Sequence, residues 1–118
     1  EKLVGATCDP ELEILKARYR DAFRAAVRDA AAQLPDEQRA VLHLYLVEGL
    51  GTQRIGALYN VNHSTVSRWM QAARDAIFAR TRQLLQERLG VRHEEFQSLV
   101  RLLQSQLDVS LAGVLGQD

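Results

Sequence analysis

The segment from Thr52 to Arg74 constrains the fold of this chain most, because two helical apolar patterns are separated there by only a short polar break. Apolar residues recur at intervals of three or four, which is typical of helices that bury one face. In the break, Asn60 can adopt the left-handed backbone conformation that a sharp turn requires. The side-chain oxygen of Asn62 can cap the helix that follows. The expected shared core consists of Ile55, Leu58, Val61, Val66 and either Trp69 or Met70.

The second helix of this pair carries a polar outer face. Its side chains are good partners for base edges or phosphates, and two helices joined by a tight turn are the plan of a helix-turn-helix, whose second helix enters the major groove. The alternative to a DNA-binding role is that these residues form a solvated helix face that binds no partner. Trp69 lies on the apolar stripe with Val66 and Ala73, so we expect it in the core rather than stacked on a base. The outward residues are His63, Ser64, Ser67, Arg68 and Gln71.

The flanking sequence also predicts helices, and no stretch alternates with the two-residue period of a strand. Asp9 and Pro10 suit the start of a long helix. Leu34-Pro35 separates that helix from the next, because a residue before proline avoids helical geometry. The fold class is therefore expected to be all-α, a four-helix core containing the helix-turn-helix plus one or two further C-terminal helices. The expected helices are 10–33, 36–47, 53–59, a long one that starts after Asn62 and runs to about 89, and 92–106.

Several local details of these helices are predicted as well. Thr52 is expected to cap the third helix, and Gly90 should end the long fourth helix. The tail from Asp108 to Leu115 is apolar at several positions. It predicts either a short helix docked on the body or an exposed segment that binds a partner. In the second helix the expected inward residues are Ala40, Val41, Leu44 and Tyr45.

The charge pattern favours a local contact with phosphates. The formal net charge is +0, but residues 50–92 carry 7 arginines against 2 carboxylates, and both flanking segments are net acidic. The basic segment coincides with the helix-turn-helix and its continuation, which suits an electrostatic footprint for nucleic acid. A solvated arginine face on a long helix is the alternative reading.

Other chemistries find little support in the sequence. No apolar run is long enough to span a membrane, and Cys8 is alone, so an internal disulfide and a cysteine-based metal site are both excluded. His43, His63 and His93 show no metal-ligand spacing, and no serine has a recognisable nucleophile context. We therefore expect a non-enzymatic, cytoplasmic protein without a metal or cofactor.

A series of short motifs extends on both sides of the helix-turn-helix. They are Leu34-Pro35, Arg39-Ala40-Val41-Leu42, Glu48-Gly49-Leu50, Ile55-Gly56, Val61-Asn62, Ser64-Thr65-Val66-Ser67-Arg68 and Ala72-Ala73-Arg74-Asp75. With them, residues 9–80 resemble region 4 of bacterial sigma-70 family factors, most like the extracytoplasmic-function type. The resemblance implies a region 4-like domain at 9–82 and a helical C-terminal extension at 83–118.

The chain departs from the usual family pattern at four places. Gly56 stands where the family usually has alanine, and Asn60 where it usually has glycine. We expect both exchanges to be sterically tolerated. Asn62 replaces the usual serine cap, and Trp69 is bulkier than the usual aliphatic residue.

The resemblance implies recognition of the −35 promoter element and docking on the β-flap of core RNA polymerase, with an anti-sigma factor as a further candidate partner. By position, Arg68 would read guanine and Gln71 adenine. Because the chain begins at Glu1, we expect a piece of a longer protein that would bind DNA weakly without its region 2. The implied base contacts are Asn62, His63, Ser64, Ser67, Arg68 and Gln71. The implied phosphate contacts are Thr52, Gln53, Arg54 and Arg74.

Two alternatives stay open. A response-regulator output domain shares a similar four-helix frame, although the Leu34-Pro35 and Ala72-Ala73-Arg74-Asp75 motifs favour the sigma resemblance. A helical protein-interaction module is also compatible with the acidic, apolar extension at 93–118. That extension would either support the recognition helix or cover it.

Overall fold

The computed structural model describes residues 10–116, apart from the side chains of Glu11 and Leu12. All regular secondary structure in this range is helical, which confirms the expected all-α class. The helices are α2 (Pro10–Arg18), α3 (Arg20–Ala32), α4 (Asp36–Leu46), α5 (Thr52–Tyr59), α6 (His63–Leu89) and α7 (His93–Leu115).

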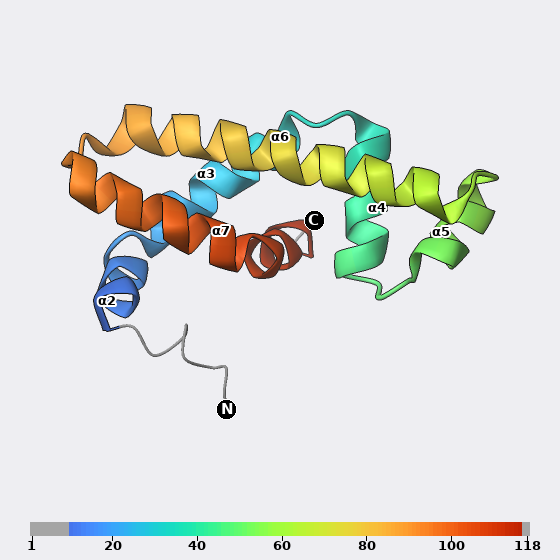
Figure 1. Ribbon diagram of the computed structural model, residues 1–118, viewed down its shortest axis with the longest axis horizontal. Coiled ribbons are helices and arrows are strands. Elements are labelled where there is room, and N and C mark those ends of the chain that lie inside the picture. The colour runs from blue at the N-terminus through green and yellow to red at the C-terminus, as the bar shows by residue number, and fades with distance from the viewer. Residues whose placement is uncertain (1–9, 117–118) are drawn as a thin grey trace.

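The two long helices α6 and α7 form an antiparallel hairpin around which the other helices pack (Figure 1). Gly90 adopts a left-handed conformation (φ 60°) at the end of α6, as expected, and the chain turns back there. Helix α3 packs against both arms of the hairpin, α2 packs on α7, and α4 and α5 pack against α6. The hairpin therefore joins the helix-turn-helix to the rest of the molecule.

One hydrophobic core joins helices α3 to α7. Its buried side chains run from Phe23 on α3 to Leu115 on α7. Helix α6 passes without a break through position 82, where the sequence predicts the end of the region 4-like domain. The extension therefore packs as part of the same core. No helix in residues 10–116 is long and apolar enough to cross a membrane.

The expected single helix over 10–33 is wrong, because the chain breaks at Tyr19 (φ −110°, ψ 17°). Helical hydrogen bonds still flank the break, from Tyr19 N to Leu15 O (2.9 Å) and from Phe23 N to Tyr19 O (2.8 Å). The apolar spacing that predicts one helix is thus kept, while the axis changes direction. Packing explains the break: α2 lies on α7, whereas α3 contacts both α6 and α7.

The expectation of a separate C-terminal segment is also wrong, because α7 continues to Leu115. Leu111, Val114 and Leu115 are buried and extend the same stripe as Phe96, Leu99 and Leu103 at helical spacing. No glycine or proline interrupts residues 93–112, so nothing ends the helix earlier. The tail thus brings Asp108 and its neighbours onto the body of the molecule.

Candidate nucleic-acid interface

The turn between α5 and α6 has the geometry that the sequence predicts. Asn60 is left-handed (φ 58°, ψ 45°), and Val61 N donates to Gly56 O at 2.9 Å. A Cβ atom on Gly56 would lie 2.6 Å from Val61 O, far inside van der Waals contact. The exchange of the usual alanine for Gly56 is therefore more than tolerated: this turn needs glycine there, while Asn60 adopts the left-handed conformation that glycine often supplies.

The start of α6 is capped as expected. Asn62 Oδ1 accepts hydrogen bonds from Ser64 N (2.9 Å) and from Ser64 Oγ (2.8 Å). The expected cap of α5 is wrong, because Gly51 is the residue that precedes that helix and Thr52 is its first helical residue. A fixed turn and a capped helix start together set the direction in which α6 presents its first two turns.

The core beneath this turn differs from the prediction at one position. Ile55, Val66 and Met70 are buried, whereas Leu58 is 66% exposed. Helix α5 is only two turns long, and its buried side carries Ile55 and Gly56. Leu58 lies at the exposed edge of this short helix.

Trp69 packs against the core, as expected. Trp69 is half-buried against the core, and its ring meets Tyr59 edge to face with 5.7 Å between centroids. Its place in the core rather than on the outer face is confirmed. On α4 the expected inward set is partly wrong, because Ala40 and Tyr45 are exposed and Leu42 is fully buried.

The six predicted base-contacting residues are all exposed around the N-terminal turns of α6. The spacing of Ser64, Ser67, Arg68 and Gln71 places them on one helix face. Two of them are held by neighbours on the same helix: Arg68 Nη2 donates to Thr65 Oγ1 at 3.1 Å, and Gln71 Nε2 donates to Asp75 Oδ1 at 2.9 Å. Residues three or four positions apart are neighbours on a helix surface, so the sequence allowed both contacts to be predicted. Neither contact was predicted.

The four predicted phosphate-contacting residues fall into two groups. Gln53 and Arg54 are exposed on the first turn of α5, and Thr52 beside them is half-buried. Arg74 lies about three turns into α6 and only 22% of its side chain is exposed. Arg74 therefore lies on a different helix from the other three.

Arg74 is held by a residue from the C-terminal helix. Its Nε and Nη2 atoms donate to the two carboxylate oxygens of Asp108 on α7, at 3.0 and 3.3 Å. Its guanidinium carbon also lies 5.9 Å from the ring centroid of Tyr45 on α4, a distance at which a cation and an aromatic ring attract. No local sequence signal links residues 34 positions apart, so sequence reasoning missed this cluster.

The side chains on this surface are suited to hydrogen bonding with a polar partner. In the part of the chain that the structure describes, no three His, Cys, Asp or Glu side chains come together as a metal site. A capped helix instead presents a hydroxyl-, amide- and guanidinium-bearing face beside a tight turn. That arrangement defines the class of helix-turn-helix DNA-binding domains.

Comparison with known proteins relates part of this chain to one family of DNA-binding domains. Residues 24–77 match the family described as Sigma-70, region 4. A segment of 45 residues is 47% identical to RNA polymerase sigma factor FliA of Pseudomonas aeruginosa, and it covers 38% of this chain and 18% of that protein. No solved structure gives a significant match. Residues 24–77 are thus similar to region 4 of sigma-70 factors, while the extracytoplasmic-function subtype stays a prediction.

Proposed function

We propose that this chain recognises the −35 element of promoters as the DNA-binding region of an RNA polymerase sigma factor. The observation that carries the proposal is the exposed, capped face of α6, which presents Ser64, Ser67, Arg68 and Gln71 beside a fixed turn. The family match supports the sigma role over that of a response-regulator output domain.

Within this face the contacts divide by chemistry. Arg68 is the strongest candidate for direct readout, because a guanidinium can donate two hydrogen bonds to the O6 and N7 atoms of guanine. Gln71 has the amide that suits adenine, once it exchanges its bond to Asp75. Gln53 and Arg54 on α5 would bind phosphates and set the position of the duplex.

A second surface supports docking on core RNA polymerase. On α4, Val41 is buried and Leu44 is half-buried, whereas Tyr45 is 37% exposed. Val47, directly after α4, is also 37% exposed. We propose that this exposed edge of α4 meets the β-flap, which implies a cytoplasmic location for the chain.

Selection from a random duplex pool, followed by fluorescence anisotropy, tests the readout role. Arg68→Ala should weaken binding to the selected duplex by about 1–3 kcal/mol and relax preference at one base pair. Arg28→Ala is the matched control, because Arg28 is an exposed arginine on α3, outside the helix-turn-helix. Equal affinity of the two variants for the selected duplex would refute the assignment of α6 as the reading helix.

A further inference from the structure

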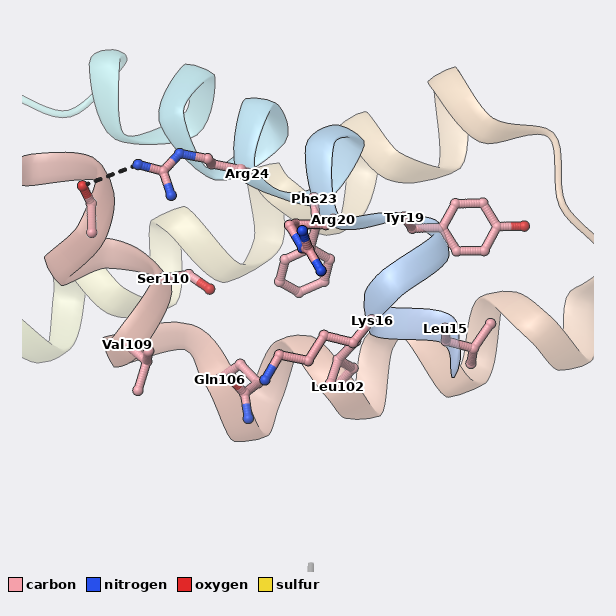
Figure 2. Close-up of a pocket in the computed structure, with 11 residues that line it drawn as sticks. Leu15, Lys16, Tyr19, Arg20, Phe23, Arg24, Leu102, Gln106, Val109 and Ser110 are labelled. Carbon is pink, nitrogen blue, oxygen red and sulfur yellow. Dashed lines mark hydrogen bonds between the residues drawn. The ribbon is translucent and has the colours of Figure 1, made fainter. Parts of the chain in front are cut away.

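A cavity of about 200 Å³ lies between α2 and α3 on one side and α7 on the other (Figure 2). Its apolar lining includes Leu15 and Phe23 from the first side and Leu102 from α7. Val109 of α7 also lines it, although this apolar side chain is 70% exposed. We call this feature the α2–α7 groove.

One wall of the α2–α7 groove is basic. Lys16, Arg20 and Arg24 line it at four-residue intervals, on both sides of the break at Tyr19. Among the side chains that the structure describes, no carboxylate forms an ion pair with any of the three. Arg24 Nη2 makes only a long hydrogen bond to Gly113 O, at 3.5 Å. The wall therefore has positive charge available for an acidic partner.

The opposite wall carries no charge. Figure 2 shows Gln106, Val109 and Ser110 of α7 along this side, with Lys16 reaching toward Gln106. A ligand that fits both walls needs carboxylates on one flank and an uncharged flank on the other, with an apolar group against Leu102 and Val109. Such a division matches the two faces of an amphipathic helix.

The size of the cavity decides what enters it. Small-molecule sites usually enclose about 300–1,000 Å³, whereas a cavity of about 150 Å³ can hold a benzene molecule. A cavity of about 200 Å³ is thus suited to one aromatic or branched aliphatic side chain. Single large side chains that fill pockets are the usual anchors of protein–protein interfaces.

We propose that the α2–α7 groove docks an acidic amphipathic helix of a partner protein. One large apolar side chain of that helix fills the cavity and covers Val109, while its carboxylates face Lys16, Arg20 and Arg24. An amphipathic helix in an apolar groove is a recurring mode of peptide recognition, and opposite charge on the walls orients it.

This docking site does not depend on promoter recognition. No residue that lines the α2–α7 groove belongs to α5 or α6, which carry the candidate base contacts. DNA and the acidic helix can therefore occupy the chain together. Failure of one proposal leaves the other standing, because each is tested with a different ligand and different variants.

The test uses a fluorescein-labelled, glutamate-rich peptide of about 15–20 residues, long enough to form a stable helix when bound, with one phenylalanine on its apolar face. Fluorescence anisotropy measures its affinity for the whole chain. Val109→Glu and Arg20→Glu should each weaken binding at least about thirtyfold, the size expected for an interface hot spot. Ile14→Glu is the matched control, because Ile14 is also an exposed apolar residue, at 60%, but does not line the groove.

Two further arms separate the groove from non-specific attraction. Replacing the peptide's phenylalanine by alanine should also weaken binding about thirtyfold. A peptide with lysines at the positions facing Arg20 should recover binding to Arg20→Glu. All substituted side chains are exposed, so circular dichroism should show unchanged folding.

Several results would overturn the proposal. These are no binding of the acidic peptide to the unmodified chain, equal binding by Val109→Glu and Ile14→Glu, or no effect of removing the phenylalanine. Self-association that Val109→Glu abolishes would identify a second copy as the occupant instead. Saturation of the site by 3-phenylpropionate without peptide binding would identify a small-ligand site instead.

Discussion

Replacing Asp108 by asparagine should strengthen binding to duplex DNA, because Asp108 occupies Arg74, a candidate phosphate contact. Two donors of Arg74 point at the carboxylate, at 3.0 and 3.3 Å. These donors cannot bind a phosphate while they bind Asp108, and a carboxylate next to a phosphate is repelled by it. Asparagine keeps the shape of the side chain and removes its charge.

The expected gain follows from the exposure of the pair. The side chains of Arg74 and Asp108 are 22% and 52% exposed, so solvent screens the ion pair in part. Exposed pairs contribute about 0.2–1 kcal/mol, and the two-donor geometry favours the upper end of that range. Release of about 1 kcal/mol corresponds to roughly fivefold tighter binding. The free energy of unfolding should fall by a similar amount.

A duplex of arbitrary sequence suffices for this measurement, because a phosphate contact carries no sequence information. Anisotropy titrations over a range of salt concentrations give the affinity and its salt dependence. Arg74→Ala should reduce the slope of log K against log salt by about 0.9, the value for one phosphate.

Asp29→Asn is the matched control for the lost charge. Asp29 also pairs with an arginine of α6, Arg88, at 2.6 Å, and it is 47% exposed, but it lies on α3, outside the helix-turn-helix. If Asp108→Asn binds DNA as Asp29→Asn does, the charge of Asp108 has no special effect on Arg74. If Asp108→Asn binds more weakly than the unmodified chain, Asp108 positions Arg74 for DNA, and the reasoning is refuted.

Three further predictions concern the turn and the core. Gly56→Ala should destabilise the chain by about 1–3 kcal/mol in urea unfolding, since the new Cβ meets Val61 O at 2.6 Å; unchanged stability would show that the turn relaxes freely. Asn62→Ala should cost about 1 kcal/mol in thermal unfolding through loss of the cap on Ser64 N, with Asn62→Asp as the control that keeps it. Thr81→Val should raise stability by about 1 kcal/mol, because Thr81 Oγ1 is buried and has no hydrogen-bond partner among the described residues; a loss of stability would contradict this.

Local signals in the sequence predicted most of the helical framework. The left-handed Asn60, the Asn62 cap and the end of α6 at Gly90 are confirmed because each depends on a few adjacent residues. The apolar stripe of α6 was predictable for the same reason. Arg68 and Gln71 share an exposed face because helical spacing alone puts them there.

The wrong predictions concern features that depend on packing between segments far apart in the sequence. The break at Tyr19 keeps the helical hydrogen bonds on both sides, so periodicity cannot reveal it. Leu58 fits the apolar spacing of a two-turn helix but lies at its exposed edge. The tail after Leu107 looked separate because polar and β-branched residues follow at once, yet its buried residues continue the stripe of α7.

The sequence by itself thus determined an all-helical chain with a capped, arginine-bearing recognition helix after a tight turn, because spacing, capping and backbone preference act over a few residues. Only the tertiary structure decided which arginine and lysine side chains can bind a partner and which are held by another part of the chain. Arg74 meets Asp108 34 positions away, and Arg24 reaches Gly113 89 positions away. The return of α7 along the body brings these residues together, so it engages one candidate DNA contact and creates the basic α2–α7 groove.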